Sequence, residues 1–291
     1  MRLKRRGTLR AEKRGALAVN AGIVTSASNA RVKWLKSLAV DARTRRSEGL
    51  WLVEGVRFVE DALDSGRKVA LVVSDNGDAS PRRAELIEKT RKSGTEMLHV
   101  TREVFLGFTD TRTPQGICAV VEAPRWTTDQ VTGGAGPVVV LDRPRDPGNL
   151  GTIMRSALAS GASGLVLAGD SVDPGNPKAL RASAGAALRL PFIRVDDPGD
   201  VRGVLGRPLY ATGGSGGRAP WDMSLAGPCA VLLGQEAEGI GSGWKDEVDA
   251  HITIPMATGV ESLNLAAAAA VILFEAARQR AEKTMPRGSA P

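Results

Sequence analysis

Two kinds of hydrophobic segment alternate along the second half of the chain. Short runs that are apolar at nearly every position lie at residues 138–142, 164–169, 191–195, 208–212, 229–234 and 251–255. Such runs are typical of strands in a parallel sheet that is covered on both faces. Segments with helical spacing separate them, at residues 149–160, 178–188, 200–205 and 262–280. The alternation predicts an open, doubly wound α/β domain over residues 138–283.

The first half predicts a second, smaller α/β domain, over residues 28–123. Helical spacing is found at residues 32–39, 56–63, 81–93 and 103–107, and strand-like runs at 50–54, 70–74, 97–100 and 116–122. Residues 43–46 indicate a basic turn, and the stretch 124–137 has the Pro and Gly content of a linker. Residues 1–27 lack apolar periodicity and predict a disordered basic extension, and residues 284–291 form a short tail.

Positive charge is concentrated at the N-terminal end. Residues 1–46 carry 13 Lys and Arg against 2 acidic side chains, a net charge of +11, whereas the whole chain has +7, so the remainder has −4. A basic arm favours a polyanionic partner, most often nucleic acid, and a solubilising tail is the alternative. The weakly apolar stretch after it, interrupted by Gly15, Asn20 and Gly22, is unlike a signal peptide. No run reaches the roughly twenty apolar residues of a membrane helix, so we expect a cytoplasmic protein.

Several function classes are disfavoured by what the chain lacks. Cys118 and Cys229 lie in apolar runs, and the two His are not clustered, so neither a disulfide nor a metal site is expected. The Gly-rich run at 213–217 is followed by Pro220 instead of a helix, and no Walker A sequence occurs. Nucleotide-dependent hydride transfer and nucleotide hydrolysis are therefore weak candidates.

Three loops in the second half carry the candidate chemistry. They span residues 142–155, 234–239 and 256–261, and each follows a predicted strand. In open α/β sheets, ligands bind at the carboxyl ends of the strands, so we expect the loops to form one pocket. Ser262 is the expected N-cap of the last helix, and free backbone N–H groups beside it suit the polar edge of a ligand.

The first two loops contain the residues most suited to chemistry. Asn149 is interpreted as a helix N-cap, and Gly151 permits the close approach of another backbone. Arg155 lies in a largely apolar helix and suits a phosphate or an anionic oxygen, although a solvated Arg is the simpler interpretation. Glu236 suits either a hydrogen bond to a ligand or a helix cap.

The three loops resemble the motifs of the SpoU (TrmH-like) family of SPOUT RNA 2'-O-ribose methyltransferases. The matching segments are Asp146-Pro-Gly-Asn149-Leu-Gly151 with Arg155, Gly234-x-Glu236-x-x-Gly239, and Ile254-Pro-Met256 with Glu261-Ser-Leu-Asn-Leu265. Their order and spacing agree over residues 138–280. Residues 28–123 are similar, less closely, to the L30e-like RNA-binding domain that often precedes this catalytic domain.

The resemblance implies a deep trefoil knot, bound S-adenosylmethionine, a homodimer formed by the C-terminal domain, and methyl transfer to a ribose 2'-hydroxyl. In this assignment, Arg155 activates the hydroxyl, and Asn149, Glu236, Ser262 and Asn264 shape the site. The implied cofactor contacts are Thr212, Gly213, Leu233, Gly234, Glu236, Ile254, Met256, Ser262, Leu263, Asn264 and Leu265. Gln235 and Ala266 depart from the residues common in the family, which affects fine cofactor contacts.

RNA is the expected substrate because DNA has no 2'-hydroxyl. The basic residues expected to bind it are Arg31, Lys33, Lys36, Arg43, Arg45 and Arg46, with Arg143 and Arg145 in the first loop. Trp34 and Trp51 lie near this set, either to stack on bases or, as we favour, as partly buried core residues. The N-terminal domain favours ribosomal (23S) RNA. A tRNA methyltransferase and a non-catalytic RNA-binding dimer scaffold are the alternatives.

Overall fold

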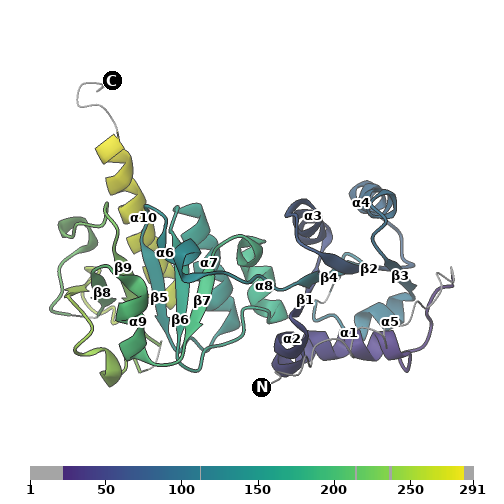
Figure 1. Ribbon diagram of the computed structural model, residues 1–291, viewed down its shortest axis with the longest axis horizontal. Helices are drawn as coiled ribbons and strands as arrows, with labels where there is room; N and C mark the ends of the chain where they lie inside the picture. The colour runs from purple at the N-terminus through teal and green to yellow at the C-terminus, as the bar shows by residue number, and fades with distance from the viewer. Residues whose placement is uncertain (1–21, 112, 214, 236–237, 285–291) are drawn as a thin grey trace, which may run out of the picture.

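The protein has two regions, each built on its own β-sheet (Figure 1). The computed structural model describes residues 22–111, 113–213, 215–235 and 238–284. The strands of the N-terminal region are β1 (Leu50–Glu54), β2 (Val69–Asp75), β3 (Met97–Val100) and β4 (Ile117–Glu122). They form a mixed sheet in the order β1-β4-β2-β3, in which β4 is antiparallel to both neighbours and β2 is parallel to β3.

Helices cover both faces of this smaller sheet (Figure 1). The helices are α1 (Ala30–Val40), α2 (Ala42–Glu48), α3 (Val56–Asp64), α4 (Pro81–Lys92) and α5 (Arg102–Leu106). Along β2, Leu71 and Val73 are buried with the residues of α1 and α5, whereas Val72 is buried with those of α3. Because side chains alternate along a strand, each face of the sheet contributes to a separate core.

The C-terminal region contains a six-stranded sheet in which all strands are parallel. Its strands are β5 (Val138–Asp142), β6 (Gly164–Ala168), β7 (Phe192–Val195), β8 (Leu209–Thr212), β9 (Ala230–Leu233) and β10 (Ala250–Ile252). Their order across the sheet is β10-β8-β9-β5-β6-β7. The predicted α/β class, the parallel sheet and the separate N-terminal domain are therefore confirmed.

Two helical layers enclose the larger sheet. The helices are α6 (Thr128–Thr132), α7 (Pro147–Ala159), α8 (Pro177–Ser183), α9 (Pro198–Leu205) and α10 (Leu265–Thr284), with short 3-10 turns at Ala186–Leu188, Pro220–Asp222 and Ser242–Trp244. α7 packs against α8 and α10 on one face, and α6 and α9 lie against β6 and β7 on the other. In the described part of the chain, no helix is both long enough and apolar enough to cross a bilayer.

The two domains share a tightly packed interface. The Trp51 ring stacks on the Phe192 ring, with centroids 6.2 Å apart and planes 9° from parallel. Arg45 is 3% exposed, and its Nε donates to Asp173 Oδ2 of the other domain at 2.7 Å. One buried hydrophobic cluster includes Trp51 from the N-terminal domain and Leu150 from the C-terminal domain. Trp51 is therefore a core residue, as the sequence favoured.

Several element boundaries differ from those expected. The basic turn at 43–46 lies inside α2, because the Asp41 side chain accepts from the backbone N–H groups of Arg43 and Thr44 and begins a helix there. The helix expected at 178–188 ends early, because Ala184 adopts a left-handed φ of +46°. The predicted linker 124–137 contains α6, whose Val131 is fully buried.

The ends of the chain also differ from expectation. Val24, within the predicted disordered extension, pairs with Val100 beside β3 through backbone hydrogen bonds. The rest of that extension, residues 1–21, and the tail from residue 285 lie outside the described residues. Ser262 is not the cap of the last helix. Asn264 Oδ1 accepts from the N–H groups of Ala266 and Ala267 instead.

Candidate active site

Four loops leave the carboxyl ends of adjacent strands β5, β9, β8 and β10 and lie at one edge of the large sheet. The ends of β8 and β10 are joined directly, because Gly213 N donates to Ile252 O at 2.9 Å. The first and third motif loops are also joined, because Asn264 Nδ2 donates to Asn149 Oδ1 at 3.0 Å. Residues that are 115 positions apart in the chain therefore meet at this edge.

The first loop is held by Asp146, which is the N-cap of α7. Its carboxylate accepts from Asn149 N at 2.7 Å and from Lys178 Nζ at 2.9 Å. These two hydrogen bonds, that of Lys178 first, hold the pKa of Asp146 below its ordinary value. The prediction that Asn149 caps the helix is therefore wrong. With the cap supplied by Asp146, the side chain of Asn149 contacts Asn264 instead.

Gly151 allows α8 to approach α7, as the sequence predicted. A Cβ atom at this position would lie 2.2 Å from the carbonyl oxygen of Ala179, which no side chain could tolerate. The close contact places the first turns of α7 and α8 side by side. The Lys178–Asp146 ion pair spans the same junction.

The second loop is a tight turn anchored to β5. Gln235 and Gly239 exchange two backbone hydrogen bonds, at 2.9 and 3.0 Å. A Cβ at Gly234 would lie 2.3 Å from the carbonyl carbon of Gly239, so this position requires glycine. Asp142 is 2% exposed, and its Oδ2 accepts from Gly241 N at 2.8 Å. Glu236 lies outside the described residues, so its role stays a prediction.

Asp142 and Lys178 have positioning roles that the sequence interpretation missed. Asp142 holds the second loop, and Lys178 pairs with the cap of α7. Asp146 stands before Pro147 at the start of an apolar helix, and Asp before Pro at such a place is a helix-start signal. That signal could have identified Asp146. An acidic residue at the end of a buried strand, as Asp142 is, gives a weaker indication.

The other predicted site residues occupy the same edge of the sheet. Thr212 and Leu233 are the last residues of β8 and β9, and Gly213 and Gly234 follow them directly. Ile254, Met256, Ser262 and Leu263 precede α10, which begins at Leu265. Met256 and Ile254 are half-buried, and Ser262 and Leu263 are exposed. A Cβ at Gly213 would meet no heavy atom within 4 Å, so there is open space beside the end of β8.

Arg155 is not joined to the Asn149–Asn264 pair. It is exposed on α7, and within the described residues its guanidinium makes no hydrogen bond or ion pair. It follows Asn149 by six residues, which at about 3.6 residues per turn places it about 120° around the helix axis. Its catalytic assignment stays a prediction.

The residues predicted to bind RNA fall into three groups. Lys33, Lys36, Arg43 and Arg46 are exposed on α1 and α2. Arg31, Arg143 and Arg145 are ion-paired, with Glu96, with Asp142 and Glu238, and with Asp170 respectively. The prediction that Arg45 binds RNA is corrected, because its buried guanidinium donates hydrogen bonds to Asp173 and to backbone carbonyls of α1.

Comparison with known proteins supplies the family. The model of the SpoU rRNA Methylase family matches residues 136–274, and that of the MRM3-like substrate binding domain matches residues 29–119. A 23S rRNA (uridine(2479)-2'-O)-methyltransferase of Streptomyces viridochromogenes is 34% identical over 286 residues, which cover 93% of this chain and 96% of that protein. The chain belongs to the SpoU rRNA methylase family. The family predicted from the three loops is thus confirmed.

Other relatives of this SpoU family member point the same way. The 23S rRNA (guanosine(2553)-2'-O)-methyltransferase RlmP of Bacillus subtilis is 30% identical over 254 residues, covering 86% of this chain and 97% of that protein. The crystal structure of the SpoU methyltransferase AviRb from Streptomyces viridochromogenes in complex with AdoMet superposes with a TM-score of 0.79 at 34% identity. That comparison covers 87% of this chain and 98% of AviRb.

Proposed function

We propose that the protein is an S-adenosylmethionine-dependent RNA ribose 2'-O-methyltransferase that acts on 23S ribosomal RNA. The observation that carries this proposal is the hydrogen bond between Asn149 and Asn264, which joins two motif loops at the carboxyl edge of the parallel sheet. The relative from Streptomyces viridochromogenes, which is matched over 96% of its length, is named as a 23S rRNA 2'-O-methyltransferase.

The residues at this edge fit the cofactor. Gly213 borders open space beside the end of β8, and loop backbone at Gly234 and Ile254–Met256 lies at the same edge of the sheet. These segments would hold S-adenosylmethionine, with Leu263 and Leu265 beside them, and Thr212 and Gly213 along its methionine portion. The cofactor supplies a methyl group that is already activated as a sulfonium, so the protein needs neither a metal nor a covalent nucleophile.

The remaining task of the chain is to align the ribose hydroxyl and to help it lose its proton. Alignment of the reactants supplies about 7–11 kcal/mol of the barrier in well-oriented reactions. Arg155 is a poor base, since the pKa of Arg exceeds about 12, so its role is to stabilise the developing alkoxide while a substrate phosphate accepts the proton. A positioned donor beside an oxyanion contributes about 2.7–4 kcal/mol.

The proposal includes a homodimer formed by the C-terminal domain. Ala267, Val271 and Phe274 repeat at helical spacing along α10 and are all exposed, Val271 by 41% and Phe274 by 52%. Contiguous exposed apolar side chains mark interaction surfaces. The trefoil knot, the L30e-like assignment of the N-terminal domain and a cytoplasmic location are proposed with it, on the support of family membership.

The decisive experiment measures methyl transfer from radiolabelled S-adenosylmethionine to 23S rRNA and tRNA transcripts. We expect saturable labelling of 23S rRNA and none of tRNA. Labelling of tRNA alone would contradict the choice of substrate. If calorimetry found no S-adenosylmethionine binding even with RNA present, the protein would instead be a non-catalytic scaffold.

A further inference from the structure

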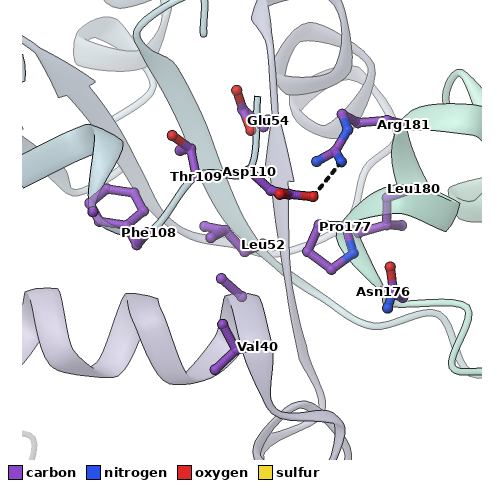
Figure 2. A pocket seen from close by; sticks show the side chains of 12 residues that line it. Val40, Leu52, Glu54, Phe108, Thr109, Asp110, Asn176, Pro177, Leu180 and Arg181 are labelled. Carbon is purple, nitrogen blue, oxygen red and sulfur yellow. Dashed lines mark hydrogen bonds and ion pairs between the residues drawn. The ribbon is translucent and has the colours of Figure 1, made fainter. Parts of the chain in front are cut away.

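A cavity of about 320 Å³ lies between the two domains, where residues of α8 face the N-terminal domain (Figure 2). Its apolar walls come from both domains: Val40, Leu52 and Phe108 from the N-terminal domain, and Pro177 and Leu180 from α8. Val40 is 73% exposed at its edge, so the cavity opens to solvent. Its size falls within the range of about 300–1,000 Å³ that is typical of ligand pockets.

Three charged groups line the polar end of this interdomain pocket. Figure 2 shows Glu54, Asp110 and Arg181 near one another, above Leu52, Pro177 and Val40. Arg181 Nη2 donates to Asp110 Oδ2 at 2.8 Å, whereas Arg181 Nη1 is buried and has no hydrogen-bond partner in the described part of the chain. Among the described residues, the Glu54 carboxylate has one hydrogen bond, which its Oε1 accepts from the Thr111 hydroxyl.

The charge of this lining argues against a phosphate. Two carboxylates face one guanidinium, so the lining has a net charge of −1 although the protein as a whole is basic. A carboxylate accepts hydrogen bonds and an unpaired guanidinium nitrogen donates them. The pocket therefore suits a flat, neutral ligand whose edge offers N–H donors next to a carbonyl oxygen.

We propose that the interdomain pocket binds an unpaired guanine base of the RNA substrate. Guanine has two adjacent N–H donors, N1–H and the N2 amino group, which match the Glu54 carboxylate, and its O6 beside them matches the Arg181 guanidinium. Uracil offers one donor to the carboxylate, and adenine and cytosine place an acceptor there. Single-stranded bases that are splayed out are the usual targets of sequence-specific RNA recognition, with their edges hydrogen-bonded and their faces against apolar groups.

The helix α8 connects the pocket to the candidate active site. Pro177 and Arg181 line the pocket, and Lys178, on another side of the same short helix, pairs with Asp146 at the start of α7. Asn149 lies in that same turn of α7. A guanine in the pocket would thus sit at a fixed offset from the reacting ribose. This inference rests on the proposed function in that it requires RNA to be the substrate.

The first test is independent of methyl transfer. Binding of GMP, IMP, AMP, CMP and UMP to the full-length protein is measured by saturation-transfer NMR. IMP differs from GMP only in lacking the N2 amino group, so we expect GMP to bind most tightly and IMP at least about tenfold more weakly, because hydrogen bonds to charged groups are among the stronger ones. Equal binding of all five nucleotides, or no saturable GMP binding up to its solubility limit, would overturn the proposal.

Three variants test whether nucleotide binding depends on the residues that line the pocket. Glu54→Gln keeps the size of the side chain but replaces one acceptor oxygen by a donor, so it should weaken GMP binding about tenfold and remove the preference for GMP over IMP. Arg181→Gln loses only a partly exposed ion pair of the free protein. It should weaken the binding of GMP and IMP equally, because both bases carry the O6 that the Arg181 guanidinium contacts. Glu88→Gln, an exposed carboxylate of α4 outside the pocket, is the matched control and should change neither.

Methylation of the 23S rRNA transcript gives the second readout. Glu54→Gln should raise KM for RNA several-fold with little change in kcat or in S-adenosylmethionine affinity, which is the pattern of lost substrate binding. An unchanged KM in an active protein would refute the pocket alone. If the unsubstituted protein methylated no RNA, the proposed function would fail, while the nucleotide-binding result would still decide what the pocket binds.

Discussion

Two carboxylates of the N-terminal domain, Asp75 and Glu54, differ in how fully they are paired and in the direction of their pKa shift. In the Asp75 cluster, consisting of Asp75, Arg83 and Arg102, the carboxylate is paired on both oxygens, at 2.5 Å to each arginine. Burial raises the pKa of Asp75, but the hydrogen bonds from Arg102 and Arg83 outweigh it and hold that pKa below the ordinary value. In the interdomain pocket, burial dominates and raises the pKa of Glu54, although the Thr111 hydrogen bond and Arg181 oppose it.

The difference separates structural charges from charges available to a ligand. A buried carboxylate with two partners is stabilised by the protein itself, and removing it leaves buried cations unpaired. A carboxylate for which the cost of burial is larger than the gain from its partners has a destabilised ionised form in the free protein. A ligand that donates hydrogen bonds to it stabilises that ionised form. The opposite pKa directions agree with one region being part of the scaffold and with the other being the proposed binding site.

The largest expected effect tests the scaffold side of this comparison. Asp75→Ala leaves Arg83, which is 3% exposed, without its carboxylate, and we expect a loss of about 3–5 kcal/mol in the free energy of unfolding, measured by urea denaturation. Glu88→Ala breaks an exposed ion pair on the same helix as Arg83 and should change stability by less than about 0.5 kcal/mol. Similar losses in the two variants would contradict the comparison. The Asp75 contribution should also be lost on acidification, as the pH falls through its lowered pKa.

Arg155 extends the comparison to the C-terminal domain, because it is an exposed arginine that makes no hydrogen bond or ion pair with the described residues. Arg155→Ala should lower the methylation rate by about 10²–10³-fold, the effect of losing one oxyanion donor, and leave unfolding and S-adenosylmethionine affinity unchanged. Arg189→Ala removes an exposed arginine from the same domain and should retain the rate. Retained methylation in Arg155→Ala would remove that residue from the proposed role.

The contact between the domains predicts an intermediate effect. A Cβ at Gly175 would lie 2.3 Å from Trp51 Nε1, so Gly175→Ala must displace Trp51 from Phe192 and should cost about 1–3 kcal/mol of stability. At Gly203, in α9, a Cβ meets nothing within 4 Å, and Gly203→Ala should stabilise by about 0.5–1 kcal/mol through helix propensity. Thermal unfolding of both variants checks the opposite signs, and equal shifts would show that the interface is looser than the stacking indicates.

The smallest effect concerns Glu54 and has a defined sign. Because its pKa is raised in the folded protein, the ionised carboxylate lowers stability once the pH exceeds that pKa. Glu54→Gln should therefore increase the free energy of unfolding at neutral pH, by less than about 1 kcal/mol since water screens this partly exposed group, and the gain should vanish near pH 4. A loss of stability at neutral pH would show that Glu54 is a structural residue like Asp75.

The sequence predicted most elements because hydrophobic periodicity reports burial directly. Strands such as β5 and β6, buried at every position, matched their apolar runs. Helix ends were less predictable, because one competing side chain decides them: Asp146 was favoured over Asn149, and Asn264 over Ser262. The break at Ala184 follows from its left-handed backbone conformation, which alanine rarely adopts, and Gly185 beside it is left-handed as well.

The candidate site was predicted more completely as a set of loops than as a set of contacts. Motif spacing placed Asn149 and Asn264 in one cluster, but it could not show which atoms meet. The interdomain pocket was not predicted, because its wall joins residues from two domains, such as Leu52 and Leu180, that no local pattern relates. Arg45 was misassigned for the same reason: its partner, Asp173, is 128 residues away.

The stacked Trp51–Phe192 contact and the Arg45–Asp173 pair hold the two domains together. Because these contacts join the two domains, we expect the proposed RNA substrate to be selected by whether its folded shape reaches both domains at once. Selection of one ribose within the proposed ribosomal RNA substrate would then depend on three-dimensional distance as well as on the bases beside the modified sugar.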